Sequence, residues 1–119
     1  MRVSWARSAA GMAALFAAPL LGAADLLYVG DARCGPCLLF EREIGPIYPK
    51  TEEARRFPLR RVAYGQPAPQ PYAFIGQPRV APTFVLVEGG REIGRFEGYH
   101  SDELFWMNLA ALLQQMPAP

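Results

Sequence analysis

Two cysteines separated by a Gly-Pro pair, in the run Cys34-Gly35-Pro36-Cys37, are the only cysteines in the chain. Such a pair can close a short disulfide, and the backbone N–H groups at a helix start stabilise a thiolate on its first sulfur. A thiolate attacks a disulfide, and a second thiol can then resolve the mixed disulfide that forms. The pattern predicts a redox centre made of these four residues. Cys34 is its nucleophile, Cys37 is its resolving thiol, and the disulfide itself is the only redox group required.

Other uses of the two sulfurs explain the pattern less well. A tetrahedral zinc site needs four ligands, and His100 is the one histidine of the chain, so no metal site is predicted. A purely structural disulfide across four residues would restrain little of the unfolded chain. A Cu(I)-binding metallochaperone stays open as an alternative function, since soft thiolates select that ion. A thiol oxidase or isomerase is the alternative within redox chemistry.

The segments on either side of the pair predict how the cysteines are presented. Residues 26–29 form a short apolar run bounded by Gly30 and Asp31, which is typical of a buried strand. Pro36 is tolerated in a first helical turn, and prolines further on end the helix. One face of this helix is expected to carry Cys37, Phe40, Ile44 and Ile47. The second cysteine is therefore expected to be buried and the first exposed. Glu41, Arg42 and Glu43 lie on the other faces and are expected to be solvated.

The rest of the chain predicts further short elements in an alternating order. Thr51 is a plausible cap for a short helix, and residues 59–63 are a plausible strand. The proline-rich stretch 65–78 is expected to be a loop, whose apolar residues either fold back on the core or line a groove. Strands over 83–87 and 92–96 form a hairpin, and Ser101 caps a helix over 102–115. This order predicts an α/β fold with a mixed sheet of about four strands flanked by helices.

The first 24 residues have the pattern of an export signal. Arg2 and Arg7 precede an uncharged stretch, which ends in the small residues Gly22-Ala23-Ala24 that a signal peptidase requires. We therefore expect a cleaved signal over 1–24, a single domain over 25–119 and a periplasmic location. An uncleaved segment of this kind would instead remain as a membrane anchor.

Charge and length exclude some partners. The chain of 119 residues carries 12 basic and 11 acidic side chains. Removal of Arg2 and Arg7 leaves 10 basic against 11 acidic residues, a net charge of −1. Such a balance gives no reason to expect nucleic acid as a partner. We expect one domain that acts as a monomer.

The cysteine motif and a second segment together resemble the thioredoxin family. The motif follows a short strand, and Ala81-Pro82-Thr83-Phe84 opens another strand, as the cis-proline segment of that family does. The resemblance implies a minimal thioredoxin-like fold with a cis-proline at Pro82 against Cys34. It also implies that the backbone at Ala81 pairs with an extended substrate segment, with Arg33 and Gly98 beside it.

A narrower resemblance is to the small periplasmic thioredoxins of bacterial sulfur-oxidation (Sox) systems. It is carried by the hairpin sequence from Pro82 to Glu92, by Gly98-Tyr99 and by Phe105-Trp106. The resemblance implies a protein disulfide reductase that keeps cysteines of sulfur-carrying proteins reduced. A membrane thiol transporter would be its electron donor, and its other partners would be protein thiols, disulfides or persulfides.

Three departures from the family pattern favour a narrow range of partners. Arg33 stands where thioredoxins usually have Trp, and it adds a positive charge that favours the thiolate. Tyr28 stands at the position of a buried Asp that assists proton transfer from the second thiol. The proline-rich stretch 65–78 takes the place of a helix.

Overall fold

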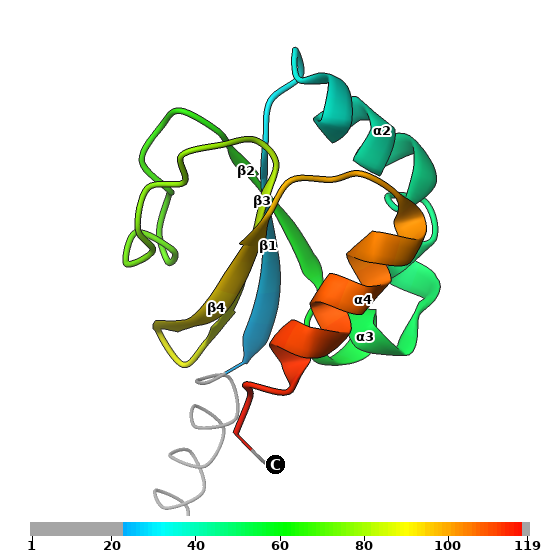
Figure 1. The fold of residues 1–119 in the computed structure, drawn as a ribbon. Helices are drawn as coiled ribbons and strands as arrows, with labels where there is room; N and C mark the ends of the chain where they lie inside the picture. Colours follow the sequence, from blue (N-terminus) through cyan, green and yellow to red (C-terminus); the bar gives the residue numbers. More distant parts are fainter. Residues whose placement is uncertain (1–22, 118–119) are drawn as a thin grey trace, which may run out of the picture.

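The computed structural model describes residues 23–117, which form one sheet with helices on one side (Figure 1). The predicted export signal over 1–24 therefore lies outside the described residues, except for its last two positions. In chain order the elements are β1 (Ala24–Gly30), α2 (Gly35–Glu43), a 3-10 turn (Tyr48–Lys50), α3 (Glu52–Arg56), β2 (Leu59–Ala63), β3 (Thr83–Glu88), β4 (Arg91–Glu97) and α4 (Asp102–Leu113). In this part of the chain no helix has the length and apolar character needed to cross a membrane.

The four strands have the order β2-β1-β3-β4. β1 pairs with β2 in parallel and with β3 antiparallel, and β3 pairs antiparallel with β4. The predicted mixed α/β sheet of four strands is therefore confirmed, including its hairpin. Gly89 and Gly90 form the hairpin turn with φ of 60° and 80°, a backbone region that favours glycine.

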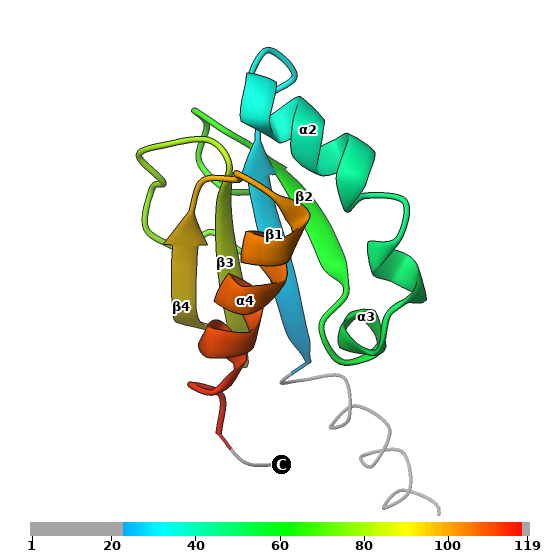
Figure 2. The same ribbon diagram turned by 45° about the vertical axis from the view of Figure 1, so that its right-hand side comes forward.

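The helices cover one face of the sheet, and this face holds the larger core (Figure 2). Successive residues of β1 point to opposite faces, so Leu26 and Tyr28 face the helices while Leu27 and Val29 face the other side. Phe40 of α2 is fully buried at the centre of this core. Its ring centroid lies 4.5 to 5.7 Å from the rings of Tyr28, Phe84, Tyr99 and Phe105. This aromatic cluster holds α2, and with it the cysteine pair, against the sheet.

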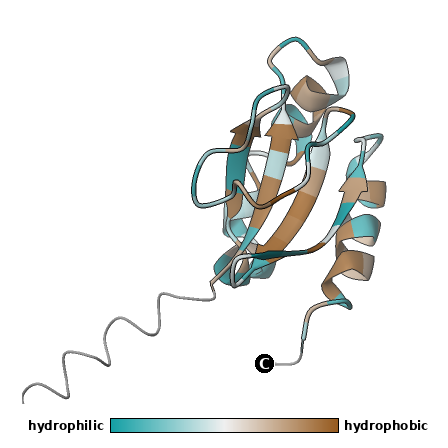
Figure 3. Cartoon of the chain, turned by 90° about the vertical axis from the view of Figure 1, so that its left-hand side faces the viewer, coloured by the Kyte–Doolittle hydropathy of each residue, from teal (hydrophilic) through white to brown (hydrophobic). Residues whose placement is uncertain are grey.

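The proline-rich loop covers the opposite face of the sheet (Figure 3). Ala68, Tyr72 and Ile75 pack against the apolar side chains of β1, β2 and β3 that point away from the helices. The structure therefore decides between the two expectations for this loop: its apolar residues fold back on the core.

Most element boundaries agree with the sequence expectations, but one predicted core position is wrong. Thr51 and Ser101 cap their helices by accepting hydrogen bonds from the N–H groups of Ala54 and Leu104. Ile47, expected on the buried face of α2, is 44% exposed. The reason is that α2 ends at Glu43, and the following turn no longer continues the helical period.

Asp25 holds the covering loop in place, and its loss should be measurable. Its carboxylate accepts hydrogen bonds from Tyr72 of the loop at 2.9 Å and from Arg60 of β2 at 3.0 Å. Because the Asp25 side chain is only 15% exposed, we expect Asp25→Ala to lower the free energy of unfolding by about 1–2 kcal/mol. Urea unfolding measures this loss.

The matched control is Glu52→Ala, which breaks an ion pair with Arg55 whose side chains are 83% and 78% exposed. That change should alter the free energy of unfolding by less than about 0.5 kcal/mol. Equal effects of the two substitutions would show that Asp25 is not an anchor.

Candidate active site

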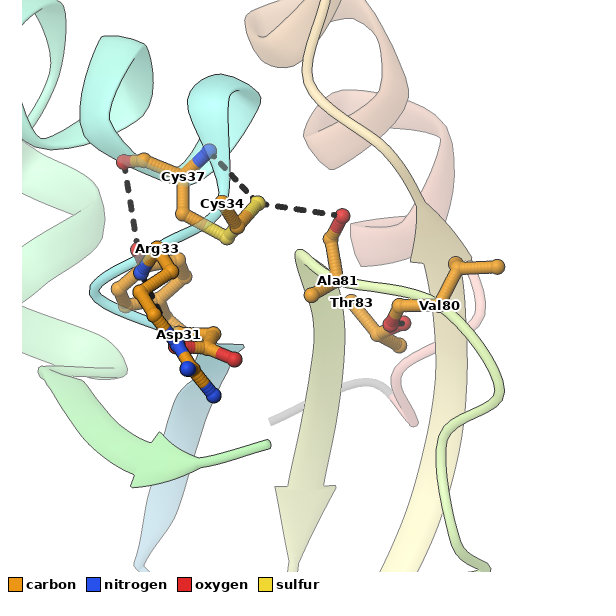
Figure 4. The surroundings of a disulfide bond; sticks show 8 residues. Asp31, Arg33, Cys34, Cys37, Val80, Ala81 and Thr83 are labelled. Atoms are coloured by element: carbon orange, nitrogen blue, oxygen red, sulfur yellow. Dashed lines mark hydrogen bonds between the residues drawn. A yellow bond between two sulfur atoms is a disulfide. The ribbon is translucent and has the colours of Figure 1, made fainter. Parts of the chain in front are cut away.

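Cys34 and Cys37 form a disulfide at the N-terminus of α2 (Figure 4). The preceding loop is shaped by Asp31, whose side-chain oxygen accepts from the Arg33 N–H at 3.0 Å and whose carbonyl accepts from the Cys34 N–H at 3.1 Å. Cys34 is the N-cap of α2, and its Sγ accepts from the Cys37 N–H at 3.1 Å. Cys34 is half-buried, whereas Cys37 is 1% exposed. The two sulfurs therefore differ in accessibility as the sequence predicts.

The Ala81-Pro82 segment lies directly against the disulfide. The peptide bond between these residues is cis, and the Ala81 carbonyl oxygen lies 3.5 Å from Cys34 Sγ (Figure 4). A disulfide sulfur carries no proton, so this is a close contact in the oxidised state that reduction would allow to become a hydrogen bond. Pro82 is itself held by Gly98, whose N–H donates to the Pro82 carbonyl at 2.7 Å. Gly98 has a φ of 88°, a conformation that favours glycine.

The remaining predicted residues surround the disulfide at different distances from its chemistry. Gly35 and Pro36 are exposed at the tip of the helix start. Val80, next to Ala81, is 41% exposed and adds an apolar edge. Arg33 is also exposed, and Figure 4 shows its side chain extending back toward Asp31, away from the sulfurs. The structure thus brings Cys34, Cys37 and Ala81 together, but not the Arg33 guanidinium.

Tyr28 occupies the space behind the buried cysteine. Its hydroxyl donates to the Cys37 carbonyl at 3.3 Å, and the residue is 5% exposed. Burial, together with the nearby Glu41 carboxylate, raises the pKa of Tyr28 to about 12, so the phenol is neutral at physiological pH. Gly30 leaves room for this hydroxyl, because a Cβ at that position would come within 2.5 Å of it. Tyr28, whose position the resemblance matched to a buried Asp, is therefore neutral and cannot accept a proton as a carboxylate would.

A charged pair that the sequence did not single out borders the same region. Arg61 of β2 donates from Nε and Nη2 to the two carboxylate oxygens of Glu41 at 2.8 and 2.7 Å. Both residues line a groove of about 360 Å³ that Tyr28 also lines. The expectation that Glu41 is simply solvated is therefore wrong. No local signal in the sequence pointed to this pair, because its two members are 20 residues apart and meet only through the packing of α2 on β2.

A second carboxylate of α2 is tied to the other side of the site. Tyr99, which follows Gly98, donates from its hydroxyl to Glu43 at 2.6 Å. Tyr99 is 3% exposed, and its ring packs on Phe40. This bond joins α2 to the segment that holds Pro82, although Glu43 itself stays exposed as expected.

Comparison with known proteins places this arrangement in a family. No protein-family model matches the chain, and no curated protein matches it. Among solved structures, the reduced periplasmic thioredoxin SoxS from Paracoccus pantotrophus is 37% identical, covering 77% of this chain and 97% of its own, with a TM-score of 0.72.

More distant structures share the fold alone. The thioredoxin of Fasciola hepatica is 23% identical, covering 86% of this chain and 92% of its own, with a TM-score of 0.52. Thioredoxin f2 of Chlamydomonas reinhardtii is 20% identical, covering 83% of this chain and 84% of its own, with a TM-score of 0.54. The chain covers almost all of SoxS, and it has the fold, the disulfide at a helix start and the cis-proline described above. The chain therefore belongs to the thioredoxin family of thiol–disulfide oxidoreductases.

Proposed function

We propose that this protein is an exported disulfide reductase that acts on cysteines of partner proteins, such as the sulfur carriers of a sulfur-oxidation system. The main support for this proposal is the asymmetry of the cysteine pair. Cys34 is half-buried beside the Ala81 carbonyl, whereas Cys37 is buried in the core. Similarity to a periplasmic thioredoxin supports the location, as does the signal pattern in the first 24 residues. The Sox resemblance supports the choice of partner.

The reaction proceeds in two exchanges. The Cys34 thiolate attacks one sulfur of a partner disulfide, forming a mixed disulfide and releasing the other partner sulfur as a thiolate. Cys37 loses its proton and attacks Cys34 Sγ, which forms the Cys34–Cys37 disulfide and releases the second partner thiolate. The partner gains two electrons and the protein loses two. A dithiol donor, which we place in the membrane, then reduces the pair again.

The redox potential of the pair distinguishes a reductant from an oxidase or isomerase. We expect a value below about −200 mV, near the value of about −270 mV that is typical of thioredoxin. Equilibration of the protein with glutathione or dithiothreitol buffers, followed by thiol counting, measures it. A redox potential near about −120 mV, the value of a strong thiol oxidase, would contradict the reductant assignment.

The Cys37→Ser variant tests the partner. Without the resolving thiol, the mixed disulfide on Cys34 should persist, so a sulfur-carrier protein with a reactive cysteine should be recovered in a covalent complex. Peptide mass spectrometry locates the joined cysteines. A double variant that also lacks Cys34 is the control. If a model disulfide forms the covalent complex but the sulfur carrier does not, the reductase assignment stands and the carrier is excluded as the partner.

A further inference from the structure

The surface on which a partner must lie has two sides that come from distant parts of the chain. One side is the start of α2 with Cys34, and the other is the cis-proline segment, residues 80–82. The Ala81 carbonyl oxygen of this segment lies 3.5 Å from Cys34 Sγ, and Cys34 is half-buried. A partner sulfur that bonds to Cys34 therefore brings its own chain along the cis-proline segment. The spacing between the two sides determines whether that chain fits.

The cis-proline segment lies beyond the end of the sheet, so strand pairing does not hold it. The β3–β4 ladder ends at Thr83. The Thr83 hydroxyl donates to the Val80 carbonyl at 2.7 Å, and the Gly98 N–H donates to the Pro82 carbonyl at 2.7 Å. These two bonds shape the segment and tie it to the turn after β4, but neither of them reaches α2.

Tyr99 joins this turn to α2. The segment between β4 and α4 passes close to the end of α2, and here the Tyr99 hydroxyl donates to the Glu43 carboxylate at 2.6 Å (Figures 1 and 2). The buried Tyr99 ring has its centroid 5.7 Å from that of Phe40 and 6.3 Å from that of Phe105. One side chain therefore links the turn that holds the cis-proline segment to α2 and to α4.

The hydrogen bond from Tyr99 to Glu43 is of a strong kind. Its length is typical of a hydroxyl that donates to an ionised carboxylate, and such bonds are roughly twice as strong as neutral ones. Burial is the main cause that raises the pKa of Tyr99 above its usual value, and the bond to Glu43 adds to it. The hydroxyl therefore keeps its proton, and remains a donor, at the neutral pH at which thiol exchange is measured.

We propose that Tyr99 is a positioning residue, which through its bond to Glu43 holds the cis-proline segment at the distance from Cys34 that an extended partner chain requires. The proposal rests on the proposed function and deepens it, because it concerns which disulfides the Cys34 thiolate can reach. Glu43 is the last residue of α2 and Cys34 is its cap, so Tyr99 acts on the geometry of the site. A disulfide within a polypeptide depends on that geometry, whereas a small disulfide without a backbone does not.

The test compares these two kinds of disulfide. Reduced protein is mixed with a disulfide-linked peptide or with the small aromatic disulfide dithiobis-nitrobenzoate. Samples are quenched with acid at set times, and the oxidised protein is quantified by mass spectrometry. We expect Tyr99→Phe, which loses only the hydroxyl, to react about tenfold more slowly with the peptide, because a small displacement of a positioning segment is costly. Its rate with the small disulfide should change by less than about twofold.

Tyr48→Phe is the matched control for loss of a buried tyrosine hydroxyl. Tyr48 is fully buried, and its hydroxyl donates to the Phe57 carbonyl at 2.8 Å, which ties the 3-10 turn to the residue after α3. Both substitutions should lower the midpoint of urea unfolding. Tyr48→Phe should nevertheless react with both disulfides at the wild-type rates.

Variants of Glu43 test whether Tyr99 acts through this one bond. Glu43→Ala removes the acceptor and should slow the peptide reaction as much as Tyr99→Phe does. Glu43→Gln keeps an acceptor oxygen and should recover most of the rate. The double variant Tyr99→Phe/Glu43→Ala should be no slower than either single variant, because the two substitutions remove the same interaction.

Three results would overturn the proposal. The first is a Tyr99→Phe protein that reduces the peptide at the wild-type rate. The second is an equal slowing with both disulfides, or the same slowing in Tyr48→Phe, either of which would assign the effect to a general loss of structure. The third is a double variant in which the two effects multiply, as they do for independent residues. A wild-type protein that reduces neither disulfide would instead defeat the proposed function.

Discussion

Replacing Cys34 with serine should abolish disulfide reduction. A hydroxyl at this position is not ionised at neutral pH and cannot form a disulfide, so no mixed disulfide can be made. Loss of a covalent nucleophile commonly costs several orders of magnitude, and we expect a decrease of at least about 1,000-fold in the rate of reduction of a glutathione-based fluorescent disulfide. Cys34 is half-buried and caps α2 through a single hydrogen bond, so the fold should persist.

Cys37→Ser is the control for this experiment. It keeps the accessible thiol beside Ala81, so its first exchange should proceed and stop at the mixed disulfide. Circular dichroism confirms that both variants are folded. A Cys34→Ser protein that retains more than about a tenth of the wild-type rate would show that the nucleophile has been misassigned.

Replacing Phe40 with alanine should have the largest effect on stability. Phe40 is fully buried among the four aromatic rings that join α2 to the sheet and to α4. Removal of a buried phenyl ring typically lowers the free energy of unfolding by about 3–5 kcal/mol. The whole free energy of unfolding of a small domain is about 5–15 kcal/mol, so this loss is a large part of it. Urea unfolding of the reduced protein should show this loss as a lower midpoint.

Leu38→Ala provides the comparison within the same helix. Leu38 is 53% exposed, so its truncation should change the free energy of unfolding by less than about 0.5 kcal/mol. Phe40→Leu, which keeps most of the volume, should fall between the two. A Phe40→Ala cost below about 1 kcal/mol would contradict the central place of this ring in the core.

Features set by neighbouring residues could be predicted from the sequence. The Thr51 and Ser101 caps involve hydrogen bonds over three residues, and both occur as expected. The strand over Leu59–Ala63 has the predicted bounds despite its two arginines. The burial of Cys37 and the accessibility of Cys34 follow from where the helix begins. Local hydrogen bonding and helical period determine all of these features.

Contacts between distant segments were decided by the tertiary structure. Glu41 is 20 residues from Arg61, and Cys34 is 47 residues from Ala81. The sequence shows the types of these residues, but their meeting depends on the sheet register and on how α2 packs. The loop over 65–78 is a similar case, because its composition was compatible with two placements and the apolar second face of the sheet selected one.

The sequence by itself therefore determined the reaction class, since the cysteine spacing and the helix start are local properties. Only the tertiary structure decided which groups surround those sulfurs. It placed the Tyr28 hydroxyl against the Cys37 carbonyl, it paired Glu41 with Arg61, and it turned the Arg33 side chain away from the sulfurs. The physical reason is that proton transfer and charge stabilisation act over a few ångströms in space, and neighbours at that distance are set by packing between elements.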